Sequence, residues 1–243
     1  MADADISSID YDAIAEGAVQ LSNYADSMQE SIQSAFSEIT NMSESWKGVS
    51  YDNVVSAINQ AVNRLNTLFE KTVYTLPSEI YQKAKSAASA DSSSLTISSS
   101  FASPITLAEI SKTGVRKLTF EGSNVADYQT KISNDFTDAT EYAEKARELA
   151  SDLKDQWDSR AGRTNLSEIR TAFKQVKEKL SSFQTLIDSS IKTQSNVASL
   201  MEGAAETIGA IQDVAEYAAE DAEDAITTAT NTINEALSDL FNV

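Results

Sequence analysis

The most restrictive feature of this sequence is a pair of heptad-spaced apolar runs, each ending at a tryptophan. Counting back from Trp46 by alternating steps of four and three residues meets only apolar residues: Met42, Ile39, Ala35, Ile32, Met28, Ala25 and Leu21. The same count from Trp157 meets Leu153, Ala150, Ala146, Ala143, Ala139, Phe136 and Ile132. With 41% hydrophobic residues in the chain, seven matches in seven arise by chance roughly twice in a thousand trials for each run. The spacing predicts helices at about residues 10–44 and 124–158 that pack like a left-handed coiled coil.

A second heptad run follows each tryptophan after a short break. In the first copy it consists of Tyr51, Val55, Ile58, Val62, Leu65, Phe69 and Leu76. In the second copy it consists of Leu166, Ile169, Phe173, Val176, Leu180, Phe183 and Ile187. A phase shift near Ser190 follows, and the run continues through Ile191, Ala198, Met201, Ala205, Ile208 and Ala215. Because short breaks join antiparallel neighbours, each copy is predicted to be a helix–turn–helix hairpin. Asp52 and Asn165 are expected to cap the second helices, and Pro77 to kink or end the helix near residue 76.

Each break contains a glycine, but the spacing differs between the copies. Trp46-Lys47-Gly48 is tight, whereas four residues separate Trp157 from Gly162. We expect both glycines to supply the positive φ that ends a helix. A tryptophan at the end of an apolar run is more often a core residue than a recognition residue, and a half-buried indole can serve both roles. Trp46, Gly48, Trp157 and Gly162 are therefore the candidates for turn formation and partner recognition.

Turns must be few, because only 7 glycines and 2 prolines occur in 243 residues. We expect an all-α protein in which two antiparallel helical hairpins form a four-helix bundle with coiled-coil-like packing. The predicted organisation is a first hairpin at 1–90, a Ser-rich linker at 91–122, a second hairpin at 123–200 and an acidic C-terminal helix or tail at 201–243.

The linker contains two features that interrupt its low complexity. Residues 117–120, Lys-Leu-Thr-Phe, resemble a short strand. Lys112, Arg116 and Lys117 form a basic cluster. Such a cluster either docks on the acidic helices or is solvated, and charge runs are more often solvated.

Composition argues against several classes of function. The net charge of −18, from 37 acidic and 19 basic residues, repels nucleic acid and anionic membrane surfaces. The chain has no Cys and no His, which removes thiolate nucleophiles, imidazole bases and the usual zinc ligands. No phosphate-binding loop, nucleophile elbow or metal-ligand spacing occurs. We therefore expect no enzyme, no cofactor and no nucleic-acid partner.

The first ten residues are acidic and lack a basic region followed by an apolar run, so they do not resemble a signal peptide. No stretch is apolar enough for long enough to span a bilayer. We accordingly expect no stable membrane insertion.

A helical hairpin with Trp-x-Gly at its tip, in a chain without a cleavable signal, resembles the WXG family of small proteins exported by type VII (ESX) secretion systems. Trp46-Lys47-Gly48 carries the motif. Family members pair through their hairpins into four-helix bundles, so this chain is similar to two such units fused in tandem. The second copy departs from the motif because its glycine is Gly162. Fusion implies a monomer that forms an intramolecular pseudo-dimer.

Family substrates also carry Tyr-x-x-x-Asp/Glu after the second hairpin helix, where it acts with a partner's Trp-x-Gly turn as a composite export signal. Tyr217 and Asp221 fit this spacing, whereas Tyr81 of the first copy has Lys85 at the acidic position. The resemblance implies a leaderless secreted or cell-surface bacterial protein. It also implies contact with the secretion ATPase or another type VII component, and with a co-secreted helical protein.

Two other functions compete with export. In the first, the chain is a non-secreted structural coiled-coil scaffold whose tryptophans only pack. In the second, it is a membrane-active toxin, which the charge of −18 and the small apolar residues disfavour.

Overall fold

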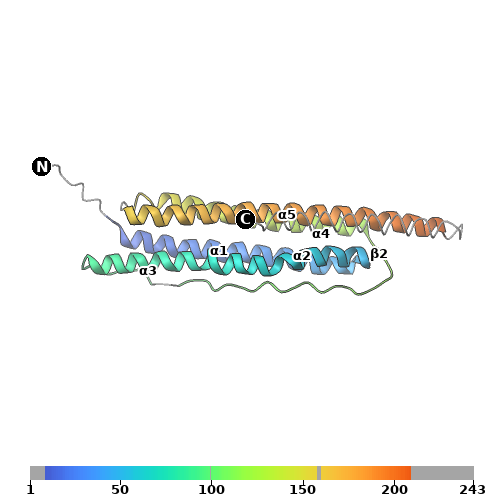
Figure 1. Cartoon of the computed structure of the whole chain (residues 1–243), viewed down its shortest axis with the longest axis horizontal. Helices are drawn as coiled ribbons and strands as arrows, with labels where there is room; N and C mark the ends of the chain where they lie inside the picture. Colours follow the sequence, from blue (N-terminus) through green and yellow to red (C-terminus); the bar gives the residue numbers. More distant parts are fainter. Residues whose placement is uncertain (1–8, 99, 158–159, 209–243) are drawn as a thin grey trace. The chain divides into compact units, whose positions relative to one another are not determined.

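The computed structural model describes residues 9–98, 100–157 and 160–208. The elements follow in the order α1 (Tyr11–Asn41), the 3₁₀-helix η1 (Met42–Glu44), β1 (Trp46–Lys47), α2 (Val49–Leu68), the π-helix η2 (Phe69–Tyr74), α3 (Thr75–Ala90), β2 (Thr119–Phe120), α4 (Gly122–Asp152) and α5 (Arg160–Ile208). Figure 1 shows that the described chain is mostly helical, as predicted, with a long extended segment between α3 and β2.

The chain divides into two compact units, each built from three separate segments. The first unit comprises Met1–Ser31, Asn66–Thr106 and Asp138–Leu180. The second comprises Ile32–Leu65, Leu107–Thr137 and Ser181–Val243. Each unit therefore combines residues of both sequence copies with part of the segment that joins them.

The heptad runs correctly predict the buried faces of the helices. The run from Leu21 to Trp46 is completely buried, and the run from Ile132 to Trp157 is at most 5% exposed. The runs that begin at Tyr51 and Leu166 are also buried as far as Phe69 and Ile187. Burial follows because a stripe of apolar side chains with this period lies on one face of a helix and leaves water together.

The predicted burial fails at Leu76, because the preceding π-helix η2 shifts the apolar residues to a different face of the helix. Leu76 is half-buried, whereas Val73, Pro77 and Ile80 are buried. Because a π-helix has more residues per turn than an α-helix, η2 rotates the apolar face of the following residues. The chain thus stays helical up to and through Pro77, which lies in the first turn of α3, where a proline is tolerated.

A second departure occurs near the end of α5. Ile191 and Ala198 are buried as predicted, but Met201 is 37% exposed. Gln129 of α4 donates to Asp188, and Gln184 donates to Ser133, so the two helices run antiparallel here. Since α4 begins at Gly122, seven residues before Gln129, α5 passes the start of α4 at about residue 195. Met201 lies beyond that point, past the start of α4, and is exposed, whereas Ala198 remains buried.

In the first unit, α1 packs against the end of α4 and the turn that follows it. Gly17 lies against Leu153. A Cβ added to this glycine would lie 2.5 Å from a methyl group of Leu153. The rings of Tyr24 and Tyr142 lie 6.4 Å apart. The amide of Asp10 donates to the carbonyl of Gln156 at 3.2 Å. These contacts join the two sequence copies.

The sequence predicts that Asn165 caps a helix, but the residue lies inside α5, which begins at Arg160. Its side-chain oxygen instead accepts a hydrogen bond from the ammonium group of Lys83 in α3, at 2.9 Å. The cap prediction is therefore wrong, because the helix starts earlier than the apolar run does.

In the second unit, three phenylalanines join α1, α4 and α5. The ring of Phe183 lies 5.6 Å from that of Phe136 and 6.5 Å from that of Phe36. All three are buried, and aromatic pairs at such distances add to the free energy gained from burial alone.

The segment between α3 and β2 is bonded to the helices along its length. In the first unit the carboxylate of Asp12 accepts from the amide and hydroxyl of Thr96, and the hydroxyl of Ser22 accepts from the amide of Ala102. The buried side chain of Gln29 bonds both the amide and the carbonyl of Ile105. The basic side chains of Lys112, Arg116 and Lys117, by contrast, are exposed. Among the described residues, no helix combines the length and the apolarity needed to cross a membrane.

Candidate functional site

The first candidate site is the turn that contains Trp46, in the second unit. The indole of Trp46 is completely buried and donates from Nε1 to the Ser50 hydroxyl at 2.9 Å. Its ring lies edge-on to Tyr51, at 6.0 Å, and to Phe120, at 5.6 Å. Since every face of the indole is covered, Trp46 is a core residue of this turn.

The phenol of Tyr51 ties the start of α2 to the end of α1. Its hydroxyl donates to the carbonyl of Ile39 at 3.0 Å. Burial, reinforced by the charge of Asp52, raises the pKa of Tyr51 to about 12 against the opposing effect of a hydrogen bond with Ser43. The hydroxyl therefore keeps its proton and remains a donor at neutral pH.

Gly48 adopts the conformation expected of a turn glycine. Its φ of +115° lies in a region that other residues rarely enter. A Cβ at this position would also lie 3.3 Å from the Cα of Leu118. The predicted positive φ is confirmed, but Gly48 does not end a helix: α1 already ends at Asn41, and Gly48 directly precedes α2, which begins at Val49.

Residues 107–120, here called the covering segment, lie on this turn and on α2. β1 and β2 pair antiparallel, with Trp46 opposite Phe120 and Lys47 opposite Thr119. The amide of Glu121, just after the segment, donates to the carbonyl of Ser45 at 2.9 Å. The Trp-x-Gly turn is therefore covered by the chain's own residues.

Asp52 binds the covering segment and does not cap α2. Its carboxylate accepts from the amide and hydroxyl of Thr113, at 2.7 and 2.9 Å, and from the amide of Gly114 at 3.1 Å. Helix α2 already begins at Val49, so Asp52 lies one turn inside it. The cap prediction is wrong at this position as well.

The second candidate site is Trp157 with Gly162, in the first unit. Trp157 is 4% exposed. Gly162 lies inside α5 and is not among the described glycines with positive φ, which are Gly48 and Gly114. A Cβ on Gly162 would come within 2.3 Å of the indole Cγ of Trp157. The predicted helix-ending role is therefore wrong, and the glycine instead leaves room for the indole.

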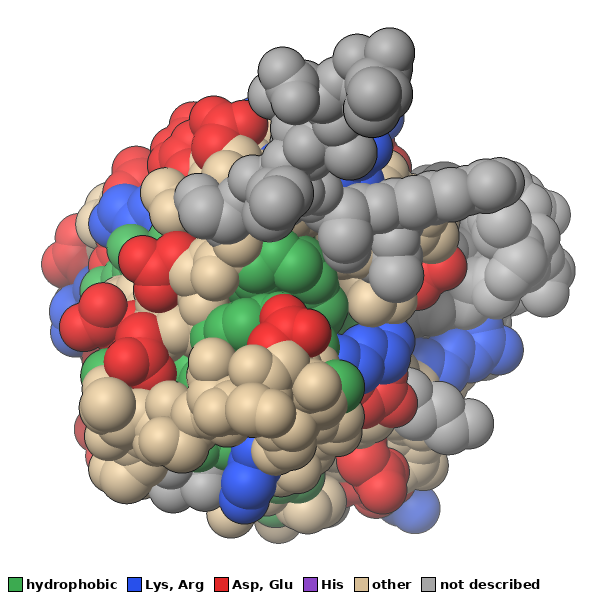
Figure 2. All heavy atoms as spheres, turned by 90° about the vertical axis from the view of Figure 1, so that its left-hand side faces the viewer, with side chains coloured by type: hydrophobic (Ala, Val, Ile, Leu, Met, Phe, Trp, Pro, Cys, Tyr) green, Lys and Arg blue, Asp and Glu red, His purple; other side chains and the backbone are tan. Residues whose placement is uncertain are grey.

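A shallow depression of about 540 Å³ lies beside Trp157. It is lined by Ile9, Gln82, Lys83, Ser86, Ala87, Trp157 and Asn165. Figure 2 looks onto the face where α1 begins and α3 ends, and shows hydrophobic side chains framed by acidic, basic and other polar ones. The depression offers one aromatic wall among mostly polar neighbours.

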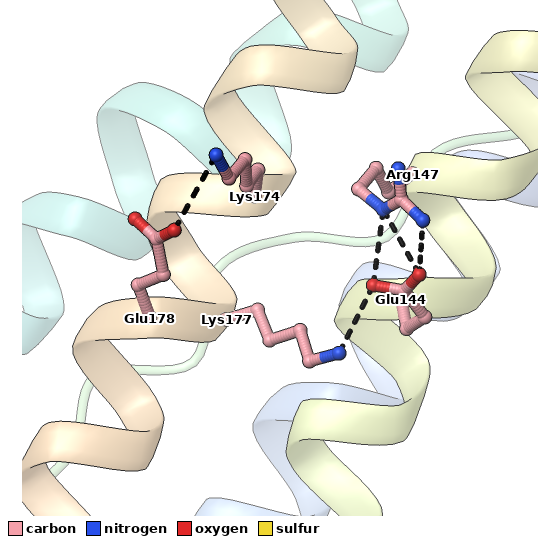
Figure 3. Close-up of polar contacts among 5 residues, drawn as sticks. All are labelled: Glu144, Arg147, Lys174, Lys177 and Glu178. Atoms are coloured by element: carbon pink, nitrogen blue, oxygen red, sulfur yellow. Dashed lines mark hydrogen bonds and ion pairs between the residues drawn. The ribbon is translucent and has the colours of Figure 1, made fainter.

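Glu144 is the described carboxylate with the most strongly lowered pKa. Its hydrogen bonds with Arg147 lower its pKa most; burial opposes them, and the hydrogen bond and charge of Lys177 lower the pKa further, to about 2. Figure 3 shows Lys177 reaching from α5 to Glu144 on α4, with a distance of 3.1 Å between nitrogen and oxygen. Glu144 therefore stays ionised at neutral pH. Its ion pair with Lys177 joins α4 to α5.

The remaining candidates, Tyr217 and Asp221, lie outside the described residues. No protein-family model, curated protein or solved structure matches this chain. Among the described residues, no group of three or more acidic side chains is placed to hold a metal ion. The described candidates for a functional site are therefore the two tryptophan sites and the surfaces around them.

Sequence reasoning missed the residues that bind the covering segment. Asn59 bonds the backbone of Ile110 through both side-chain atoms, and Asp52 bonds Thr113 and Gly114. A signal was present, because Asp52 and Asn59 are seven residues apart and so share one face of a helix. Short polar side chains on such a face resemble ordinary surface residues until a partner segment is known.

Proposed function

We propose that this chain is a non-enzymatic substrate or adaptor of a type VII (ESX) secretion system, and that it acts through helix–helix contacts with partner proteins. The observation that carries the proposal is the Trp46-Lys47-Gly48 turn at the end of an unbroken buried heptad run. The proposed partners are the secretion ATPase or another component of that system, and a co-secreted helical protein. The proposed location is outside the cell or on the bacterial surface.

We further propose that the two copies are antiparallel hairpins that pair within one chain as a four-helix bundle. Support comes from contacts between the copies inside each unit, such as Tyr24 with Tyr142 and Phe36 with Phe183. An exposed apolar face on each hairpin would otherwise need a second chain, and fusion supplies the partner at high effective concentration.

Fractionation of the native host tests the export function. We expect the chain in the culture medium or on the cell surface of the parent strain, and in the cytosol of a strain that lacks the secretion ATPase. A cytosolic protein serves as the lysis control. Finding the chain only in the cytosol of both strains would reject export.

The complete burial of Trp46 favours the alternative function, a non-secreted coiled-coil scaffold in which the tryptophans only pack. The same fractionation distinguishes the two, because a scaffold stays with the cytosolic or particle fraction whether or not the ATPase is present. Sedimentation of that fraction would then identify the assembly to which the scaffold belongs.

A further inference from the structure

The covering segment is held on α2 in the way that an extended peptide is held by a receptor. The side-chain oxygen of Asn59 accepts from the amide of Ile110 at 2.9 Å, and its nitrogen donates to the carbonyl of the same residue at 2.9 Å. An amide side chain offers the same donor and acceptor as a neighbouring strand. Asn59 therefore recognises an extended backbone at this position whatever side chain that residue carries.

Asp52 extends this recognition by two turns of α2. Its carboxylate accepts from two successive backbone amides, those of Thr113 and Gly114, and from the Thr113 hydroxyl. Hydrogen bonds to an ionised acceptor are stronger than those between neutral groups. Asp52 and Asn59 together bind three residues of the segment through its backbone.

Three side chains of the segment add apolar contacts to these hydrogen bonds. Leu107 and Ile110 are 3% and 5% exposed. Phe120 pairs with Trp46 in the short ladder and lies edge-on to its indole at 5.6 Å. Backbone hydrogen bonds combined with pockets for a few side chains are the usual basis for recognising an extended peptide.

We propose that the surface formed by Trp46, Asp52 and Asn59 is a peptide-binding site of which the covering segment is an intramolecular, displaceable ligand. The ligand that displaces the covering segment from this site is an extended segment of a partner protein. That segment carries two apolar residues three positions apart, followed ten positions later by an aromatic residue, as Leu107, Ile110 and Phe120 are spaced here. The proposal goes beyond the proposed function, since it holds for an exported or a retained chain.

The covering segment is suited to displacement because it is not part of a helix. Between the end of α3 at Ala90 and the start of β2 at Thr119, the described residues (91–98 and 100–118) form no helix or strand. Segments with few buried contacts open locally without unfolding the helices beneath them. A tethered ligand competes at an effective concentration of about millimolar, so a partner peptide binds weakly until the segment is released.

Peptide binding to the full-length chain tests this site. The probe is a fluorescein-labelled synthetic peptide of residues 105–121, and binding is followed by fluorescence anisotropy. In the released variant, Ile110→Ser with Phe120→Ser weakens the covering segment and leaves Trp46, Asp52 and Asn59 intact. We expect the peptide to bind the released variant at least about tenfold more tightly than the wild-type chain, because the competing ligand is gone.

Two controls show whether the peptide occupies the proposed site. Adding Asn59→Leu to the released variant removes the amide that bonds the backbone, and should abolish binding. Val115→Ser changes an exposed residue of the same segment and should leave the affinity at the wild-type value. A helical released variant that trypsin cuts at Arg116 and Lys117, but that does not bind the peptide, overturns the proposal. Binding that survives Asn59→Leu overturns it as well.

Hydrogen exchange of the wild-type chain decides the question if the released variant does not fold. The proposal expects the amides of Ile110 and Thr113 to exchange through an opening that leaves Val54 and Leu65 of α2 protected. Exchange of all four amides only on global unfolding would show that the segment is a permanent part of the core, and would overturn displacement.

Discussion

At the scale of single residues, Gly162 shows how a glycine inside a helix can be required by a neighbour. Its missing side chain makes room for the Trp157 indole. An alanine here would raise the helix propensity, but its methyl group would clash with the indole. We predict that Gly162→Ala lowers the free energy of unfolding by about 1–3 kcal/mol. Denaturant unfolding followed by circular dichroism measures the change.

Gly203 provides the matched control for this substitution. It lies in the same helix, and nothing lies within 4 Å of the position its Cβ would take. Gly203→Ala should be neutral or should stabilise the chain by up to about 1 kcal/mol. Equal stabilities of the two variants would show that Trp157 yields to a methyl group at no cost.

The ion pairs of Glu144 predict a pH dependence at the same scale. Its pKa is lowered to about 2 in the folded chain, from an ordinary value of 4.5. The ionised Glu144 therefore stabilises the folded chain fully when the pH is above the ordinary pKa. This stabilisation is lost as the pH falls through the pKa of the folded chain. We predict that Glu144→Gln lowers the free energy of unfolding by about 0.5–1 kcal/mol at pH 7. The difference should shrink from pH 4.5 to about 2.

Lys174 and Glu178 form a comparison pair along one face of α5 (Figure 3), with 3.7 Å between nitrogen and oxygen and both side chains more than 60% exposed. Exposed pairs of this spacing contribute about 0.3–0.5 kcal/mol. Glu178→Gln should therefore have the smaller effect at pH 7. A Glu144→Gln effect no larger than this would mean that the Arg147 and Lys177 contacts are not maintained in solution.

At the scale of elements, Asp52 joins α2 to the covering segment and is not needed by α2 itself. We predict that Asp52→Ala leaves the helix content unchanged, because α2 already begins at Val49. It should also speed trypsin cleavage after Arg116 and Lys117 several-fold, because Thr113 and Gly114 lose their shared acceptor. Mass spectrometry of the early fragments measures both sites. Glu109→Ala, at an exposed position of the same segment, is the control and should leave the cleavage rate unchanged.

At the scale of the whole molecule, each compact unit contains helices of both copies and hence the partner that a lone hairpin would lack. We predict that the chain is a monomer. Equilibrium sedimentation should give a mass near 26.3 kDa over a wide range of concentrations. A mass of twice this value would mean that the pairing occurs between chains.

Export is also a property of the whole molecule, and two substitutions separate recognition from packing. We predict that Tyr217→Ala abolishes export and changes stability by no more than about 0.5 kcal/mol, as surface substitutions usually do. Trp46→Ala should instead lower stability by about 3–5 kcal/mol, because it empties a fully buried site. Export of Tyr217→Ala at the parental level, in a host that exports the parent, would reject Tyr217 and Asp221 as a signal.

The buried faces of the helices follow from the amino-acid sequence alone. A stripe with a heptad period can leave water only by packing against another stripe, so burial from Leu21 to Trp46 and from Ile132 to Trp157 follows from local spacing. The positive φ of Gly48 was also predictable, because a glycine shortly after an apolar run is a common turn residue.

Contacts between residues far apart in the sequence become visible only in the folded chain. Asn59 bonds a residue 51 positions away, and Asp52 bonds residues 61 and 62 positions away. Gly162 faces an indole that precedes its helix, and η2 shifts a phase that the apolar run does not reveal. The helix-side residues Asp52 and Asn59 share a seven-residue spacing, but the backbone groups they bond and the space beside Gly162 leave no pattern in the sequence. The two tryptophans could therefore be located from the sequence, whereas the segment that covers Trp46 could not.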